Sequence, residues 1–279
     1  MEAANQFTKD MTSIKSENLI FKRQVLETSI CKCGNEYESH IKAGIAGRER
    51  DIKLEHCNKC YEKEQELEYQ QEHKKELLKE HLKSFNRESL VNDKLKQASF
   101  ESYQPTTEQL TKAKAVCKRY VCTFDLDKSR NLLLIGNYGT GKSHLAVSIA
   151  KEVMHKEYMS ALFISTPKLL TKLRSTYNYG SKETENEIIN QLSRVSLLVL
   201  DDIGSEQSKP SNDLNEQTWA TSKIFEIIDN RIGKHTIYTT NYDVVELQQR
   251  LGGRNFSRMM EDTFVVKMFG KDYRLRDFK

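Results

Sequence analysis

LLLIGNYGTGKS (residues 132–143) decides the fold of this chain. Its last eight residues match the phosphate-binding pattern G-x-x-x-x-G-K-[ST]. The four apolar residues before them predict a short buried strand. Residues 144–155 predict a helix, with Leu145, Ile149 and Val153 at helical spacing. A strand that leads through a glycine-rich loop into a helix N-terminus directs backbone N–H groups at a polyphosphate. The stretch therefore predicts a nucleotide site rather than an ordinary glycine-rich turn.

The predicted nucleotide site needs ligands for both phosphate and metal. Lys142 is expected to reach the outer phosphates of ATP, and the Ser143 hydroxyl to bind Mg²⁺. The residues expected to bind the nucleotide and its metal, including one from the strand described next, are Gly136, Asn137, Tyr138, Gly139, Thr140, Gly141, Lys142, Ser143, His144 and Asp201.

A second element, Leu197-Leu198-Val199-Leu200-Asp201-Asp202, reads as a hydrophobic strand that ends in two carboxylates. Beside a phosphate-binding loop, Asp201 is expected to hold Mg²⁺, directly or through water. Asp202 is expected to orient or deprotonate the attacking water, with Glu206 as the alternative. Aspartate is one methylene shorter than the glutamate more usual at this second position, which favours slow hydrolysis. Without the loop, the same pattern would indicate only a solvated acidic turn.

Composition limits the classes of protein to consider. The 279 residues are 30% charged and 37% hydrophobic, which predicts a soluble globular protein. The net charge of +4 does not by itself argue for a nucleic-acid partner. No apolar run approaches the ~20 residues of a membrane helix, and the polar N-terminus is unlike a secretory signal. We therefore expect a cytoplasmic protein without a membrane partner, whose six cysteines are metal ligands or free thiols.

The chain divides into three stretches of different character. Residues 1–62 carry four cysteines and predict a small N-terminal domain. Residues 63–98 are rich in Glu, Lys and Gln without Pro or Gly, which predicts a charged helical linker, or alternatively a coiled coil or partner-binding helix. Residues 99–279 alternate apolar strands with helical patterns, which is typical of an α/β domain with a parallel sheet. The strands expected there are Leu132–Ile135, Ala161–Ser165, Leu197–Leu200, Thr236–Thr240 and Thr263–Met268.

Helical patterns between those strands also predict particular packing. One helix is expected from Trp219 to Ile232, with an apolar face that includes Ile232 and a packed Trp219. Cys117 and Cys122 are interpreted as packing residues of another helix.

Four cysteines near the N-terminus form two close pairs, Cys31 with Cys33 and Cys57 with Cys60. Four thiolates delivered as two pairs can close a tetrahedral Zn²⁺ site without an open position, so the predicted site is structural. His40 or His56 replacing one thiolate remains an alternative, as do unligated thiols. A structural zinc would add folding energy to a module too small for much core.

Three motifs together resemble a known family: GNYGTGKSHLA (136–146), LLVLDDIG (197–204) and TTNY (239–242). The combination is similar to AAA+ ATPases of the DnaC/DnaI replicative-helicase-loader type and to the related IstB transposition ATPases. The resemblance covers residues 99–279 and implies an AAA+ P-loop fold of three αβα layers with a five-stranded parallel sheet. The zinc pattern favours the loaders, because DnaI-type loaders carry an N-terminal zinc domain that binds the helicase.

The resemblance also implies catalytic roles, for Asp202 and for three further residues. Asn241 resembles the sensor-1 residue that contacts the γ-phosphate or the attacking water. Arg258, with Arg254 as its rival, resembles an arginine finger that reaches the ATP of a neighbouring subunit, and Arg274 resembles the sensor-2 arginine. The alternatives are surface ion pairs for the arginines and a strand-end turn for Asn241. Only eleven residues follow Met268, a short C-terminal part that loaders share.

A basic stretch with interleaved tyrosines lies between the second and third expected strands. Such residues suit a single-stranded backbone and stacked bases, and the resemblance implies that this interval helps to bind single-stranded DNA. A solvated helix with a flexible loop is the alternative. The residues are Lys168, Lys172, Arg174, Tyr177, Tyr179 and Lys182.

The function implied is an ATP-dependent loader of a hexameric replicative helicase onto single-stranded DNA, which self-associates through its AAA+ domain. Its expected cofactors are ATP, Mg²⁺ and Zn²⁺. Three alternatives remain open: an IstB-like transposition ATPase, a weakly hydrolysing, ATP-gated adaptor, and, ranked last because the cysteine module lacks an obvious Arg-rich recognition helix, a zinc-based DNA-binding protein.

Overall fold

A computed structural model describes residues 21–45, 48–89, 93–205 and 218–275. The chain forms two compact units, residues 1–73 and 74–279. The candidate base Glu206 lies outside the described residues. None of the described helices combines the length and the apolar character needed to cross a bilayer.

The second unit is built on a five-stranded parallel sheet, and the five strands expected from the sequence are confirmed. Their order is β5-β6-β7-β4-β8. The strands are β4 (Asn131–Ile135), β5 (Ala161–Ser165), β6 (Leu197–Asp201), β7 (His235–Thr240) and β8 (Thr263–Lys267). Because all strands are parallel, their carboxyl ends meet at one edge of the sheet, where open α/β sheets bind ligands.

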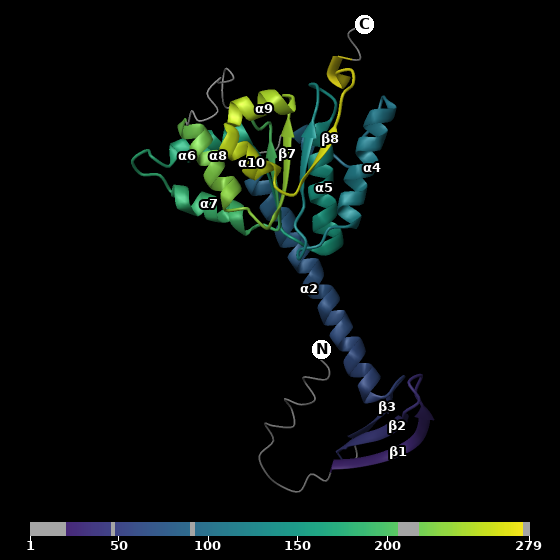
Figure 1. Ribbon diagram of the computed structural model, residues 1–279. Helices are drawn as coiled ribbons and strands as arrows, with labels where there is room; N and C mark the ends of the chain where they lie inside the picture. The colour runs from purple at the N-terminus through teal and green to yellow at the C-terminus, as the bar shows by residue number, and fades with distance from the viewer. Residues whose placement is uncertain (1–20, 46–47, 90–92, 206–217, 276–279) are drawn as a thin grey trace. The chain divides into compact units, whose positions relative to one another are not determined.

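Helices cover both faces of this sheet, which confirms the three-layer αβα fold (Figure 1). Helices α4 and α5 pack on one face, and α6 to α10 pack on the other. The helices of this unit are α3 (Asp93–Lys96), α4 (Glu108–Cys122), α5 (Lys142–Glu157), α6 (Thr166–Ser175), α7 (Glu185–Arg194), α8 (Trp219–Asp229), α9 (Val244–Leu251) and α10 (Gly253–Met260), and the short 3-10 helix η1 covers Tyr273–Leu275.

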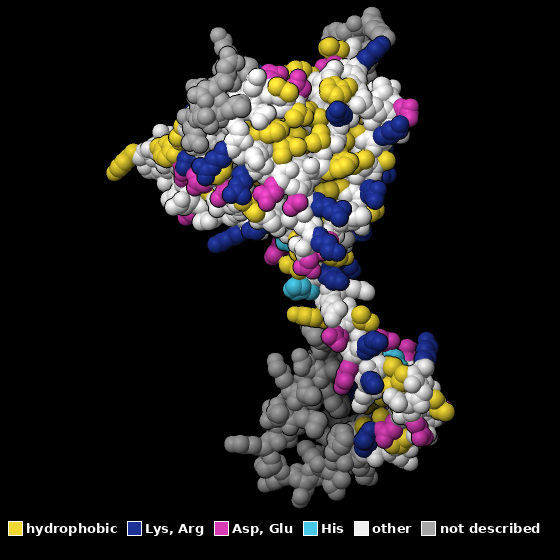
Figure 2. Space-filling model, viewed as in Figure 1, with side chains coloured by type: hydrophobic (Ala, Val, Ile, Leu, Met, Phe, Trp, Pro, Cys, Tyr) yellow, Lys and Arg dark blue, Asp and Glu magenta, His cyan; other side chains and the backbone are white. Residues whose placement is uncertain are grey.

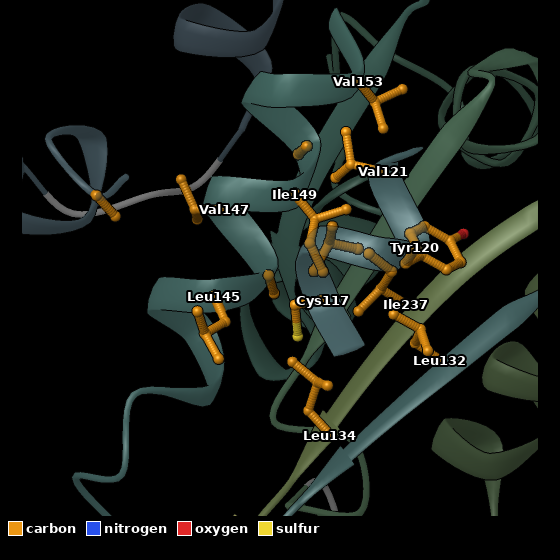
Figure 3. Packing of buried hydrophobic residues seen from close by; sticks show 14 of the residues in the cluster. Cys117, Tyr120, Val121, Leu132, Leu134, Leu145, Val147, Ile149, Val153 and Ile237 are labelled. Carbon is orange, nitrogen blue, oxygen red and sulfur yellow. The ribbon is translucent and has the colours of Figure 1, made fainter. Parts of the chain in front are cut away.

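The burial of strand β4 explains why its residues Leu132–Ile135 form an unbroken apolar run in the sequence. Leu132 and Leu134 are buried on the face covered by α4 and α5, whereas Leu133 is buried on the opposite face. Figure 3 shows Leu132 beside Ile237 of β7 and Leu134 beside Cys117 of α4. A strand buried on both faces has no polar positions to alternate with, so it reads as an unbroken hydrophobic run.

Two packing predictions in this unit were partly wrong. Cys117 is fully buried in the core, but Cys122 at the end of α4 is exposed. Helix α8 ends at Asp229, and Ile232 is 47% exposed in the turn that follows, where Gly233 adopts φ +76°. The turn uses backbone bonds from Arg231 and Ile232 to the last residues of the helix, so the helical spacing that included Ile232 no longer applies.

The first unit contains an antiparallel sheet that the sequence analysis did not anticipate. Its strands are β1 (Phe21–Ile30), β2 (Glu36–Ile45) and β3 (Arg48–Lys53), in the order β1-β2-β3. The β1–β2 turn contains Cys31 and Cys33, and Gly34 takes the left-handed conformation (φ +86°) that this tight turn requires. The sheet therefore places one cysteine pair in a turn.

Helix α2 (Asn58–Glu88) begins in the first unit and ends in the second. Residues 61–76 are exposed, as expected for a charged, solvated helix. Within the second unit, Phe85 is buried in the core, and Leu78 and Leu82 pack against it. The helix begins at Asn58, between Cys57 and Cys60, so the charged helix includes one of the predicted metal ligands.

Candidate nucleotide site and cysteine cluster

The phosphate-binding loop connects β4 to α5 at the carboxyl edge of the sheet. Gly139 and Gly141 take left-handed conformations (φ +69° and +88°) that favour glycine. A Cβ atom on Gly141 would overlap the ring of Tyr103, and one on Gly139 would overlap the carboxylate of Asp272. The glycines are thus required both by the backbone and by the two segments that pack against the loop.

Lys142 is buried in the loop, with 5% of its surface exposed. Its ammonium group donates to the carbonyl oxygens of Gly136 (2.9 Å) and Asn137 (2.7 Å), and to Oδ1 of Asn241 (2.7 Å). Burial lowers the pKa of Lys142 to about 8, although the charges of Asp202 and Asp201 oppose this shift. These three oxygen atoms keep the Lys142 ammonium group in the loop, where it is expected to bind phosphate oxygens.

The two carboxylates at the end of β6 differ in their surroundings. Asp201 is buried, and burial followed by the charge of Asp202 raises its pKa to about 6. Hydrogen bonds from the hydroxyls of Thr239 and Ser143 oppose the shift. Asp202 is partly exposed and has a left-handed backbone (φ +58°). Carboxylate and hydroxyl oxygens are hard ligands that suit Mg²⁺, so Asp201 and Ser143 fit the metal implied by the sequence.

Asn241 joins the two halves of the site. Its Oδ1 accepts from Lys142, and its Nδ2 donates to Oδ1 of Asp202 at 3.1 Å. Strand β7 lies between β6 and β4 in the sheet, so its carboxyl end falls between the acidic strand and the loop. The structure therefore brings together Lys142, Ser143, Asp201, Asp202 and Asn241, as the sequence predicted.

The residues after β8 return to the phosphate-binding loop. The backbone N–H of Tyr273 donates to the carbonyl of Gly139 at 3.1 Å, and the N–H of Arg274 donates to the Asp272 carboxylate at 2.9 Å. The Arg274 side chain is exposed, and its charge contributes, after burial, to the lowered pKa of Lys142. Arg274 thus lies near the site, but Asp272 and Tyr273 were not predicted to contact the loop.

His144, near the start of α5, is hydrogen-bonded to the segment that precedes α4. Its Nε2 lies 2.8 Å from the carbonyl oxygen of Ser99 and 3.1 Å from the Ser102 hydroxyl. Tyr103 in the same segment donates from its hydroxyl to the carbonyl of Thr140 at 2.9 Å. His144 therefore attaches residues 99–103 to the start of α5.

A pocket opens beside the phosphate-binding loop, between residues 102–110, the loop and the residues after β8. Its lining includes Tyr103, Gln104, His144 and Tyr273. The sequence analysis missed Tyr103 and Gln104, because a tyrosine and a glutamine some thirty residues before the loop carry no local pattern.

The two candidate arginine fingers lie on α10, away from this loop. Arg258 is 46% exposed and forms long ion pairs with Asp229 (3.8 Å) and Glu261 (3.6 Å). It lines a small pocket with Asn131 and Gly233, at the amino ends of β4 and β7. Arg254 stacks on the ring of Phe225 at 4.2 Å. Neither side chain is placed at the nucleotide site of its own chain.

The basic stretch on α6 and the loop after it is partly neutralised. Lys172 pairs with Glu183 at 2.9 Å, and Arg174 stacks on the ring of Trp219 at 4.7 Å. Hydrophobic side chains project at the tip of the α6–α7 loop (Figure 2), where Tyr179 is fully exposed. Tyr177 is 61% exposed but already hydrogen-bonded to Glu185. Both tyrosines are therefore exposed, as are Lys168, Arg174 and Lys182, whereas Lys172 is half-buried.

In the first unit, the sulfurs of Cys31, Cys33, Cys57 and Cys60 all lie within 4.8 Å of one another. Backbone hydrogen bonds from Cys33 and Cys57 lower the pKa of the Cys31 thiol to about 6, whereas hydrogen bonds with the sulfurs of Cys33 and Cys31 raise the pKa of Cys60. The four sulfurs thus share protons with one another, and Cys31 is the thiol favoured as a thiolate, the form that binds metals. This four-sulfur cluster can hold a metal ion, and zinc suits four thiolates.

The two histidines that were alternative zinc ligands lie outside this cluster. His56 pairs with Glu64 at 3.0 Å, and Nε2 of His40 is buried without a hydrogen-bond partner among the described residues.

The three-layer α/β fold and the phosphate-binding loop at the carboxyl edge of its sheet identify the chain as an AAA+ P-loop protein. Over residues 55–279 the chain matches the family described as IstB-like ATP binding protein, and it belongs to that family. The replicative helicase loader DnaC of Escherichia coli (strain K12) is 30% identical over 196 residues, which cover 69% of this chain and 75% of DnaC.

Solved structures agree with this assignment. The crystal structure of the DnaC helicase loader has a TM-score of 0.54 at 25% identity, over 63% of this chain and 99% of that one. The crystal structure of DnaI has a TM-score of 0.54 at 23% identity, over 66% of this chain and 94% of that one, and shows the shared fold. The resemblance to DnaC-type loaders, drawn from three motifs, is therefore confirmed.

Proposed function

We propose that this protein loads a hexameric replicative helicase onto single-stranded DNA, and that ATP controls the loading. The observation that carries this proposal is the Lys142–Asn241–Asp202 connection in a chain similar to DnaC. It links the phosphate-binding loop to the acidic strand through one side chain, so a nucleotide that engages Lys142 changes the contacts of Asn241 and Asp202 as well.

For ATP binding, the backbone N–H groups of the loop at the start of α5 would cradle the phosphates. Lys142 would exchange its carbonyl acceptors for phosphate oxygens. The pocket beside the loop, with Tyr103 and Gln104, is positioned to take the nucleoside.

For hydrolysis, Ser143 and Asp201 would hold Mg²⁺, which neutralises charge on the phosphates when bound. Asp202 would accept a hydrogen bond from the attacking water and receive its proton, and Asn241 would orient both. Arg274 lies near the loop and would add positive charge there, whereas Arg258 or Arg254 would serve a neighbouring copy of the chain through self-association.

The cysteine cluster supports a structural zinc in the first unit, with Cys31, Cys33, Cys57 and Cys60 as ligands. In this proposal the zinc-bearing unit grips the helicase, and the accessible tyrosines of the α6–α7 loop contact single-stranded DNA. Such a loader acts in the cytoplasm.

The test is co-purification with a replicative helicase in the presence and absence of ATP, using the full chain and its Lys142→Ala variant. The proposal predicts capture that depends on ATP and is altered in the variant. Capture of a transposase instead of a helicase would identify an IstB-like transposition ATPase. Helicase capture without measurable ATP turnover, with or without single-stranded DNA, would identify an ATP-gated adaptor.

A further inference from the structure

Thr239 is a fully buried residue of β7, two positions before Asn241, and has no role in the reaction described above. Its hydroxyl makes two hydrogen bonds to consecutive residues of the neighbouring strand end. It donates to Oδ1 of Asp201 at 2.6 Å, and it accepts from the backbone N–H of Asp202 at 3.0 Å. A hydroxyl can donate only one proton. Here it donates that proton to the carboxylate, which can only accept, and its oxygen accepts from the N–H, which can only donate.

These bonds occur where regular pairing of the sheet ends. The β6–β7 ladder runs to the pair Leu200 and Tyr238, and Asp202 then turns into the left-handed region with φ +58°. Beyond that pair, Ile203 donates to the carbonyl of Thr239 at 2.9 Å, and the Thr240 hydroxyl donates to the carbonyl of Ile203 at 2.9 Å. Two threonines of β7 thus hold the corner 201–203, and Thr239 is the one that contacts the carboxylate.

We infer that Thr239 is a positioning residue for the magnesium-dependent part of nucleotide binding: its hydroxyl orients the Asp201 carboxylate and fixes the backbone of Asp202. The inference rests on the proposed function, since it takes Asp201 as the carboxylate that holds the metal. Outer partners that orient a ligating carboxylate commonly contribute 10- to 100-fold to metal affinity. Among the described residues Thr239 makes no hydrogen bond to the phosphate-binding loop, so we expect its loss to change the effect of Mg²⁺ on ATP affinity rather than phosphate binding itself.

The experiment measures ATP affinity by calorimetry for the full-length protein, in EDTA and in excess Mg²⁺. Thr239→Val keeps the shape of the side chain and removes the hydroxyl. We expect its affinity in EDTA to match that of the unaltered protein, and the gain in affinity on adding Mg²⁺ to fall about tenfold. Thr239→Ser restores the hydroxyl and is expected to restore the gain. Thr236→Val removes another buried hydroxyl at the opposite end of β7 and serves as the matched control.

An unchanged magnesium response in Thr239→Val would overturn the inference, as would an equal loss of affinity in EDTA and in Mg²⁺. If the valine variant does not fold, amide hydrogen exchange of the unaltered, metal-free protein decides. The Asp202 amide is expected to be protected by Thr239, and fast exchange there would count against it.

Asp201→Asn separates the inference from the proposed function. A magnesium response that survives in Asp201→Asn rejects the metal assignment itself. A response lost in Asp201→Asn but kept in Thr239→Val rejects only the role of Thr239.

Discussion

The Lys142 ammonium donates a 2.7 Å hydrogen bond to the side-chain oxygen of Asn241, a residue 99 positions further along the chain. The same amide group donates from its nitrogen to Asp202 at 3.1 Å. The neutral side chain of Asn241 therefore connects the Lys142 ammonium to the Asp202 carboxylate, the two charged groups expected to act on a bound nucleotide. A phosphate bound in the loop would compete with Asn241 for the Lys142 ammonium and so would release the side-chain oxygen of Asn241.

Replacing Lys142 by alanine is expected to weaken ATP binding about 10- to 100-fold, because a charged hydrogen-bond donor is lost from the phosphate site. Calorimetry with ATP measures the change. Lys112→Ala, which removes an exposed lysine paired with Glu108, is the matched control and is expected to bind normally. Equal affinities in the two variants would reject the nucleotide site.

Asn241→Ala is expected to slow ATP hydrolysis about 100-fold, the size of effect seen when one orienting donor is removed from an active site. ATP affinity should change much less, because Lys142 keeps its two carbonyl acceptors and remains available to phosphate. Turnover and binding are measured separately on the same preparation, with the exposed Asn190→Ala as control. A loss confined to affinity would contradict the assigned role.

The cysteine cluster predicts about one zinc per chain and a first unit that depends on it. Cys57→Ser is expected to lower the zinc content measured by mass spectrometry, whereas Cys122→Ser, which alters an exposed cysteine, should leave it unchanged. Chelation should remove the metal and the structure of the first unit, while the second unit keeps its own apolar core. Full zinc content in Cys57→Ser would show that Cys57 is not required to hold zinc.

His235 predicts a pH dependence of stability. Its ring is buried and stacks on Phe124 at 4.1 Å, and burial, followed by the charge of Arg231, lowers its pKa below the ordinary value, although carbonyls of Asp125 and Arg130 oppose the shift. The unfolded chain therefore binds a proton more readily than the folded one. The contribution of His235 is complete above about pH 6.5 and is lost as pH falls towards the folded pKa.

Urea unfolding between pH 5 and pH 8 tests this dependence. The free energy of unfolding should decrease below about pH 6.5, and less steeply in His235→Gln than in the unaltered protein. His155→Gln, which alters an exposed histidine, should keep the original slope. Identical slopes in all three proteins would exclude His235 as the source.

Much of the second unit was predictable because its signals are local. Strands β4, β5 and β6 are short apolar runs that are almost completely buried, and all five strands, including the less buried edge strand β8, were predicted within one residue of their observed bounds. The phosphate-binding loop depends on a few adjacent residues, so its pattern is visible in the chain itself. The cysteine pairs are likewise close in sequence, and their convergence into one cluster follows from the β1–β2 turn and the start of α2.

Other parts depend on contacts between residues distant in the chain. Nothing near Tyr103 indicates that its ring packs under Gly141, and nothing near Thr239 indicates that its hydroxyl meets Asp201. His144 was predicted from its place in the motif to contact the nucleotide; that contact stays a prediction, and the structure adds that its side chain binds Ser99 and lines the pocket beside the loop. A sequence motif therefore predicts where a residue lies along the backbone, whereas the direction of its side chain depends on the residues that pack against it.

The sequence by itself determined the class of domain, the loop with Lys142 and Ser143, and the acidic end of β6, because each is encoded by neighbouring residues. Only the tertiary structure decided the full strand order, with β7 between β6 and β4, and the individual contacts that follow: Asn241 bridges Lys142 and Asp202, and the Thr239 hydroxyl binds Asp201. The physical reason is that strand order in a parallel sheet is set by how crossover helices pack, and no local pattern records it.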